Sequence, residues 1–270
     1  MQDVRSRLFE HIRGRRYRAV LVAERSGVLS GVEAALEAAR ELGIELEICK
    51  AEGDELSHGG VFANFAGSPE LIAAAEERLM GTMSKASGIA TAARTAVQVA
   101  DGRVKIVSGA WKKMPGQIKS LVRQAIAAGG ASFRITEPPM VYMDKNFVRM
   151  FGSIRETLAA AACFEDATKC IQLRGETASI REETLQAVEG GAHILMVDTG
   201  RIEDAEECVK YLRANGWRER VQVAFAGNVD IGCIPELLDR VDVDILDIGK
   251  RIVDAPLLDM RLEVIGEEQA

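Results

Sequence analysis

The residues that could do chemistry in this chain stand at the ends of short apolar runs. Six of these ends carry a cation, a carboxylate or a glycine: Lys112, Arg134, Lys145, Asp198, Gly227-Asn228 and Gly249-Lys250. Cations stabilise a leaving anion, a carboxylate suits sugar hydroxyls or Mg²⁺, and glycine lets backbone N–H groups approach a phosphate. Any one of them could be an ordinary solvated loop residue. Six that converge on one edge of the fold favour a binding site.

The apolar runs themselves predict a parallel sheet. They cover 104–108, 140–143, 170–173, 194–197, 221–225 and 245–248. Amphipathic helical stretches lie between the later runs, at 181–189 and 204–215. Strand–helix–strand repeats are typical of βαβ units, and about six of them favour a barrel over an open sheet. In such barrels the functional groups lie at the carboxyl ends of the strands.

The first hundred residues have a different order and spacing of expected strands and helices. The expected elements are strands at 19–23, 44–49 and 60–65, a helix at 31–42, and a long helical region from Pro69 to Ala100. Ser87-Gly88 interrupts that last region, which indicates two helices or one kinked helix. We therefore predict an N-terminal α/β sandwich domain in 1–100 and an α/β barrel domain in 101–270.

Composition excludes several classes of function. Of the 270 residues 47% are apolar and 28% charged, and no apolar run approaches the 18 residues that a membrane span needs. The N-terminus lacks a signal-peptide pattern, so a cytoplasmic location is expected. A net charge of −7 argues against nucleic acid as a partner. Five cysteines without CxxC spacing and only three histidines argue against a zinc site, a disulfide framework or a histidine cluster.

Eight short motifs follow one another in a recognisable order. They are AERSGVLSG at 23–31, SGIAT at 87–91, KKMPG at 112–116, AGGASFR at 128–134, MVYMDKN at 140–146, GAHILMVD at 191–198, AGN at 226–228 and DIG at 247–249. In this order the chain resembles the quinolinate phosphoribosyltransferase family, also called nicotinate-nucleotide pyrophosphorylase. SGIAT matches that family residue for residue, and the later motifs resemble its RKTTPG, GGGxNHR, MVLIKDN, GADIIMLD, SGG and SVG strings. The resemblance implies an N-terminal sandwich followed by an incomplete, seven-unit, TIM-like barrel.

The resemblance also implies a phosphoribosyl site. Lys112 matches the loop lysine that meets the diphosphate of the donor, and Asp198 matches a barrel aspartate near the ribose and its Mg²⁺. The phosphate-binding candidates are Gly227, Asn228, Gly249 and Lys250. A solvated lysine, a helix N-cap and turn glycines are the structural alternatives. A family carboxylate falls on Arg174, although Glu176, two residues further on, is expected to face the same side.

Several positions of the acceptor pocket depart from the family pattern. They are Glu77 in place of Arg with Arg78 beside it, Trp111 in place of Arg, Phe133 in place of His before a retained Arg134, and the reversed pair Asp144-Lys145. On a strand such a reversal moves the cation to the other face. Two charges about 4 Å apart interact by about 4 kcal/mol at an effective dielectric near 20. Losing several cations should therefore prevent tight binding of the quinolinate dianion. The alternative is that the neighbouring cations Arg78 and Lys145 rotate in and restore the site.

Two hypotheses follow. The first is a divergent phosphoribosyltransferase that uses phosphoribosyl diphosphate, Mg²⁺ and a nitrogen heterocycle other than quinolinate. Trp111 and Phe133 would stack on the ring, and Glu77 or Asp144 would accept hydrogen bonds from it. The second is a non-catalytic or repurposed barrel that binds a phosphorylated ligand. The resemblance further implies a homodimer in which Glu77 and Arg78 face the barrel of the partner subunit.

Overall fold

The computed structural model describes residues 4–268, which form two compact units. The first comprises the chain up to Arg94 together with Met114–Gly130 and the chain from Asp254 onward. The second comprises Thr95–Lys113 and Ala131–Val253. The units therefore have other boundaries than the domains 1–100 and 101–270, because two segments after residue 100 pack within the first unit. Among the described residues, no helix is long and apolar enough to cross a membrane.

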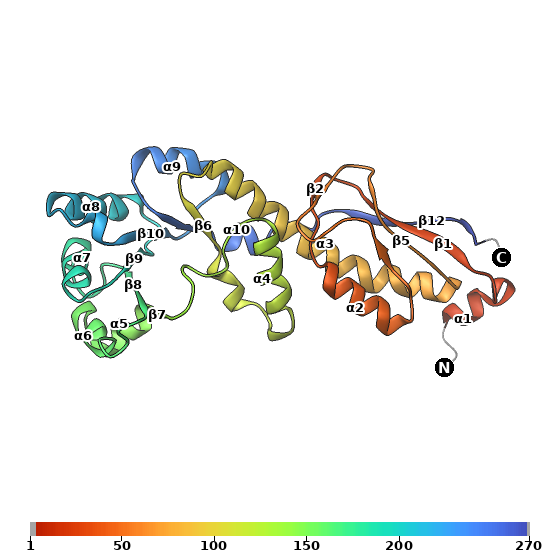
Figure 1. The fold of residues 1–270 in the computed structure, drawn as a ribbon, viewed down its shortest axis with the longest axis horizontal. Coiled ribbons are helices and arrows are strands. Elements are labelled where there is room, and N and C mark those ends of the chain that lie inside the picture. Colours follow the sequence, from red (N-terminus) through yellow and green to blue (C-terminus); the bar gives the residue numbers. More distant parts are fainter. Residues whose placement is uncertain (1–3, 269–270) are drawn as a thin grey trace. The chain divides into compact units, whose positions relative to one another are not determined.

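An antiparallel four-stranded sheet forms the base of the first unit (Figure 1). Its order is β12 (Met260–Glu267), β1 (Tyr17–Ala23), β5 (Val61–Gly67) and β3 (Glu47–Ile48). The apolar runs predicted β1, β3 and β5, but the sequence analysis did not predict β12. This strand lies along β1, with Leu262 opposite Leu21 and Met260 opposite Ala23. The last part of the chain therefore completes the N-terminal sheet.

Helices α2 (Val32–Leu42) and α3 (Pro69–Ala100) pack against this sheet. The first unit also contains α1 (Val4–Leu8), α4 (Lys119–Ala128) and a small ladder that joins β2 (Gly27–Val28) to β4 (Glu55–Leu56). The predicted helix at 31–42 is confirmed as α2, which Gly43 ends in the left-handed conformation. Leu21, Leu79 and Met83 are fully buried in the core of this unit. The long helical region predicted from Pro69 is a single helix, because α3 continues through Ser87-Gly88.

The SGIAT motif ties α3 to the chain around β2. Ser87 Oγ accepts a hydrogen bond from the Ser30 amide at 2.9 Å, and Thr91 Oγ1 accepts one from the Val28 amide at 2.9 Å. A Cβ on Gly88 would lie 2.1 Å from the carbonyl oxygen of Pro256, so only glycine lets the two backbones approach this closely. The motif therefore has a packing role within the first unit.

The second unit contains the parallel strands of the barrel. The sheet order is β6 (Lys105–Val107), β11 (Ile245–Asp247), β10 (Gln222–Ala226), β9 (Ile194–Val197), β8 (Thr168–Leu173) and β7 (Met140–Met143). A parallel bridge also joins Val107 to Ser132, which stands where a strand between β6 and β7 would lie. Six strands and this single bridge give the incomplete α/β barrel that the sequence predicted, and all six strands match predicted apolar runs.

Helices follow the strands around the outside of the barrel (Figure 1). They are α5 (Lys145–Phe151), α6 (Ile154–Ala160), α7 (Ile180–Glu189), α8 (Ile202–Ala214), α9 (Ile234–Arg240) and α10 (Lys250–Val253), with a 3₁₀ segment η2 (Gly109–Lys113) after β6. The predicted helices at 181–189 and 204–215 are confirmed as α7 and α8. Inside the barrel, buried side chains such as Val107, Cys170, Met196 and Ile245 form one apolar cluster, against which Tyr142 packs.

Two glycines of α3 give a matched test of this packing. We expect Gly88→Ala to lower the free energy of unfolding by roughly 1–3 kcal/mol, because its new methyl group would meet backbone atoms. Gly81→Ala, on the same helix, meets nothing within 4 Å and should raise stability by about 0.5–1 kcal/mol through helix propensity. Urea denaturation of both variants measures the difference, and equal effects would contradict the packing role.

Candidate active site

Four polar side chains stand at the carboxyl ends of the parallel strands, and we call this group the barrel mouth. They are Tyr142 on β7, Gln172 on β8, Asp198 after β9 and Asp247 on β11. Each continues the inward-facing side of its strand: Gln172 follows Cys170, Asp198 follows Met196 and Asp247 follows Ile245 at a spacing of two. Because the strands are parallel, all four side chains meet at one edge of the barrel.

Asp198 has partners on β8 and in the loop that follows it. Gln172 Nε2 donates to Asp198 Oδ2, and Arg174 Nη1 donates to the same oxygen at 3.3 Å and to the Asp198 carbonyl at 2.7 Å. Burial raises the pKa of the Asp198 carboxyl, while the charges of Arg174, Lys145 and Lys113 act in the opposite direction. The carboxylate predicted as a catalytic group therefore lies among three cations at the mouth.

Asp247 is the second carboxylate of the mouth. Its Oδ1 accepts a hydrogen bond from the amide of Gly109 at 3.0 Å, which links β11 to the start of η2. Burial raises the pKa of Asp247, against the lowering effect of the Gly109 amide, and the charge of Asp198 raises it further. Lys112 and Lys113 lower it, so both lysines of η2 lie close to this carboxylate. Sequence reasoning did not select Asp247, although its spacing of two from Ile245 would have indicated it.

Three lysines near the mouth are not engaged in ion pairs. Lys112, Lys113 and Lys145 form no direct salt bridge with any residue between 4 and 268, and neither does Arg134, which lies beside Phe133. Lys112 Nζ instead lies 4.7 Å from the ring centre of Tyr142, and the Arg134 guanidinium lies 5.2 Å from the ring centre of Phe133. Unpaired cations beside two carboxylates can bind an anionic group and polar hydroxyls at the same edge.

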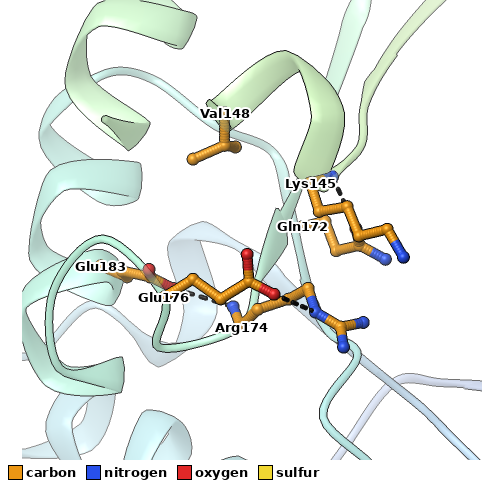
Figure 2. Close-up of a pocket in the computed structure, with 6 residues that line it drawn as sticks. All are labelled: Lys145, Val148, Gln172, Arg174, Glu176 and Glu183. Atoms are coloured by element: carbon orange, nitrogen blue, oxygen red, sulfur yellow. Dashed lines mark hydrogen bonds and ion pairs between the residues drawn. The ribbon is translucent and has the colours of Figure 1, made fainter. Parts of the chain in front are cut away.

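The reversed pair Asp144-Lys145 behaves differently from the sequence prediction. The strand ends at Met143, and Asp144 caps α5 by accepting from the Asn146 amide at 2.8 Å and the Phe147 amide at 3.4 Å. Lys145 is the first residue of that helix, so strand alternation does not apply to it. Its side chain lies beside Gln172 in a small pocket at the mouth (Figure 2). The reversal therefore leaves a cation at the site.

Trp111 and Phe133 contact each other. Trp111 Nε1 donates to the Phe133 carbonyl at 2.6 Å, and the two rings pack edge to face with centres 6.3 Å apart. This contact holds η2 against the segment that precedes Arg134. The structure thus brings the two predicted aromatic residues together, and their stacking on a substrate ring stays a prediction.

Glu176 lies in the same pocket as Lys145, but its carboxylate is neutralised by arginines (Figure 2). It binds Arg149 at 2.7 Å and Arg174 at 3.1 Å, and these bonds lower the pKa of its exposed carboxyl. The sequence argument placed it on the same face as Arg174 by alternation. Because β8 ends at Leu173, alternation stops before that point.

Buried Glu183, which sequence reasoning missed, organises the loop after β8. Its carboxylate accepts from the amides of Arg174, Gly175 and Thr177 at 2.8, 2.9 and 3.1 Å, and from the Thr177 hydroxyl at 3.0 Å. The side chain belongs to α7 and is only 1% exposed. Glu183 therefore fixes the backbone from which Arg174 reaches Asp198.

The predicted phosphate-binding residues follow β10 and β11 at the same end of the barrel. Gly227 has φ +111°, and a Cβ there would lie 2.5 Å from Gly200, so this glycine allows close contact between two loops. Asn228 also has a positive φ, while Gly249 and Lys250 lead into α10. Their contact with phosphate stays a prediction.

Glu77 and Arg78 lie on α3 in the first unit. Both are exposed, and their partners are Arg5 at 2.8 Å and Glu41 at 3.6 Å. Their role opposite a partner subunit stays a prediction.

A barrel with two carboxylates and unpaired cations at the carboxyl ends of its strands defines a class, the α/β-barrel enzymes that act on anionic small molecules. Family models then identify the chain more closely. The model of the quinolinate phosphoribosyl transferase C-terminal domain matches residues 89–263, and that of its N-terminal domain matches residues 3–87. The chain belongs to the quinolinate phosphoribosyl transferase family.

Individual relatives agree with this assignment. A probable nicotinate-nucleotide pyrophosphorylase [carboxylating] of Methanothermobacter thermautotrophicus is 28% identical over 258 residues, covering 94% of this chain and 90% of the relative. The human nicotinate-nucleotide pyrophosphorylase [carboxylating] is 27% identical over 255 residues, covering 93% and 84%. The solved nicotinate-nucleotide pyrophosphorylase of Francisella tularensis has the same fold, with a TM-score of 0.79, 20% identity and coverage of 97% and 90%.

Removing the guanidinium beside Asp198 should change the ionisation of that carboxyl. We expect Arg174→Gln to raise the pKa of Asp198, because Arg174 is the strongest of the cations that favour its charged form. A ¹³C NMR titration of the Asp198 carboxyl measures the shift. Arg149→Gln, which removes an arginine whose ion-pair partner within residues 4–268 is Glu176 rather than Asp198, is the control and should change this pKa much less. A fall in the pKa of Asp198 in Arg174→Gln would contradict the assignment.

The loop after β8 should loosen when Glu183 loses its charge. Glu183→Gln should lower the free energy of unfolding by roughly 2–3 kcal/mol and speed hydrogen exchange at Gly175 and Thr177, because a buried charged acceptor is replaced by an amide. Glu182→Gln is the matched control, since Gln also supports the capping box with Ser179 and the site is exposed. Exchange rates that rise equally in both variants would refute the role of Glu183.

Proposed function

We propose that this chain transfers the 5-phosphoribosyl group of phosphoribosyl diphosphate to a ring nitrogen of a heterocycle other than quinolinate. The observation that supports this most is the set of unpaired cations beside Asp198 and Asp247. A site of this charge pattern suits a donor that carries both phosphate groups and sugar hydroxyls. The relatives, named nicotinate-nucleotide pyrophosphorylases, support the same reaction class.

The reaction needs no protein nucleophile. The bond between the ribose C1 and the diphosphate oxygen breaks, the diphosphate leaves with the electron pair, and a ring nitrogen forms the new bond to C1. Positive charge develops on the sugar and negative charge on the leaving group. Lys112, with Lys113 beside it, would stabilise the diphosphate, and Asp198 would hold the ribose hydroxyls and stabilise the cationic sugar.

Mg²⁺ is expected to arrive with the diphosphate. Among residues 4–268 no three histidine, cysteine or acidic side chains gather into a metal site. Mg²⁺ usually keeps several waters and takes one or two carboxylates plus substrate phosphates, so a single carboxylate is sufficient. Asp198 Oδ1 accepts no hydrogen bond within the described chain and fits that role, with charge neutralisation on the diphosphate as the contribution of the metal.

The acceptor should carry less charge than quinolinate. The indole N–H of Trp111 is engaged by the Phe133 carbonyl, and the ring of Phe133 offers no cation. Arg134 and Lys145 remain as cations for the acceptor, and Lys145 already lies near Asp198. Two cations beside a nearby carboxylate suit a monoanionic or neutral ring better than a dianion, since each uncompensated close charge costs several kcal/mol.

The alternative of a non-catalytic phosphate-binding barrel receives no support from this site, because Lys112 and Asp198 both lie at the mouth. The homodimer and the cytoplasmic location remain predictions.

Titration with the donor tests the proposal. Phosphoribosyl diphosphate with Mg²⁺ should bind in isothermal calorimetry, and Lys112→Ala should weaken the affinity at least tenfold by removing a cation from the diphosphate. Lys210→Ala, an exposed lysine on α8, is the control. Quinolinate should be turned over with kcat/KM well below about 10⁴ M⁻¹s⁻¹, and Glu77→Arg combined with Trp111→Arg and Phe133→His should raise that value.

Two results would contradict the proposal. An unmodified protein that binds no donor is not a phosphoribosyltransferase. An unmodified protein that converts quinolinate at about 10⁴ M⁻¹s⁻¹ or faster has retained the acceptor of its family.

A further inference from the structure

Tyr142 is a polar residue in the apolar interior of the barrel. It lies on β7 in register with Cys170 of β8, and it packs against the interior cluster. The family string MVLIKDN has leucine at this place, whereas this chain has MVYMDKN. Leucine would fill the same space without a hydroxyl, so packing alone does not explain the tyrosine.

The side chain of Tyr142 lies on the inward-facing side of β7, near the carboxyl end of that strand. Burial raises the pKa of Tyr142 above its ordinary value, and the neighbouring Cys170, Asp247, Asp198 and Asp144 raise it further. Three of these neighbours are the carboxylates at the ends of β7, β9 and β11. The phenol therefore stays protonated at neutral pH, and its O–H group is available as a hydrogen-bond donor in the site.

This donor has no partner in the protein. Within residues 4–268 the Tyr142 hydroxyl makes no hydrogen bond, and the contact recorded for the side chain is that of Lys112 with its ring. Tyr142 is half-buried, and its hydroxyl is not one of the buried polar atoms that lack a partner among residues 4–268, so the hydroxyl is accessible to water. A bound molecule with an acceptor oxygen can take the place of that water.

The ring and the hydroxyl of Tyr142 serve different ligands. The ring face attracts the Lys112 ammonium at 4.7 Å and so keeps this lysine at the mouth, where the donor would meet it. The charges of Asp198 and Asp247 act on the hydroxyl, so both carboxylates lie in its neighbourhood. The cations Lys112, Lys113 and Lys145 offset part of the charge of these carboxylates. A ring that carries one carboxylate or carbonyl oxygen is therefore repelled less at this place than a ring that carries two anionic groups.

We propose that Tyr142 is a specificity-determining residue, whose hydroxyl donates a hydrogen bond to a carboxylate or carbonyl oxygen on the acceptor ring. The inference rests on the proposed phosphoribosyl transfer and names the class of its acceptor, a heteroaromatic ring with one carboxylate or carboxamide.

The variant Tyr142→Phe removes only the hydroxyl. It should weaken binding or raise KM for pyridine-3-carboxylate tenfold or more, because a hydrogen bond to a charged group is lost. Binding of phosphoribosyl diphosphate should change less than twofold, since phenylalanine keeps the ring face for Lys112. Unsubstituted pyridine, which lacks an acceptor oxygen, should bind both proteins equally. Pyridine-3-carboxamide, run beside them, separates a carboxylate from a carbonyl partner.

Tyr142→Leu is the second variant and introduces the residue of the family string. This variant should bind pyridine-3-carboxylate as weakly as Tyr142→Phe does, because it also lacks the hydroxyl. It should bind the donor more weakly as well, because the ring that contacts Lys112 is gone. Thermal melting of both variants identifies any loss of folding, and Tyr142→Phe keeps the test valid if the leucine variant unfolds.

The outcomes separate this inference from the proposed function. Equal affinity of the unmodified protein and Tyr142→Phe for pyridine-3-carboxylate and its amide overturns the inference, as does a failure of the unmodified protein to bind either of them while it binds the donor. Donor binding is measured alone, so its absence counts against phosphoribosyl transfer. Even in that case, weaker binding of pyridine-3-carboxylate by Tyr142→Phe would support the role of the hydroxyl.

Discussion

The pairing of β6 with β11 is the constraint on which the candidate site depends. These strands come from opposite ends of the barrel sequence, and their register places Val107 beside Asp247. The same register brings η2 next to that carboxylate, where the Gly109 amide binds it. Because Lys112 and Lys113 belong to η2, both lysines reach Asp247, and Lys113 reaches Asp198 as well. Without the pairing of β6 with β11, nothing would hold the lysines of η2 close to these carboxylates.

The charge at the mouth depends on which side chains contact Asp198 as well as on the number of charged groups. Gln172 accepts from the Lys145 amide at 2.6 Å and donates to Asp198, so a neutral side chain joins α5 to the barrel aspartate. Arg174 neutralises part of the Asp198 charge, and Glu183 holds the loop from which Arg174 extends. The remaining cations therefore do not have to pair with carboxylates of the protein. A bound anion can take that place without displacing an existing salt bridge, which lowers the free energy required for its entry.

The sequence predicted the repetitive parts of the fold well, because burial imposes a pattern on them. The six barrel strands are short apolar runs, and α2, α7 and α8 have amphipathic spacing. β12 was missed although Met260, Leu262 and Val264 alternate with Arg261 and Glu263, which is the pattern of a half-buried strand. No local rule indicates that this segment pairs with β1, more than 200 residues earlier. Long-range pairing of this kind depends on the whole fold.

The site was predictable only where a strand determined it. Asp198 directly follows β9, and its place at the mouth agrees with that reasoning. Lys112 lies on η2 beyond the end of β6, so its place depends on that segment as well. Alternation failed for Lys145 and Glu176 because both lie beyond the last strand residue, where a helix or a loop sets the direction of the side chain. Glu183 sits on a helix with an ordinary amphipathic pattern, and its acceptor role arises only when the loop folds over it.

Motif matches and chemistry carry different information in this chain. SGIAT is the motif that matches its family letter for letter, yet Ser87 and Thr91 bind backbone groups near β2, and Gly88 allows contact with Pro256. Such residues are constrained by packing, which any member of the family must preserve whatever molecule it binds. Of the positions that depart from the family strings, Tyr142 lies at the mouth and Trp111 belongs to η2, next to the lysines of the mouth, whereas Glu77 lies on α3 in the first unit. Packing motifs therefore establish the family of this protein, while its acceptor has to be argued from the side chains that differ.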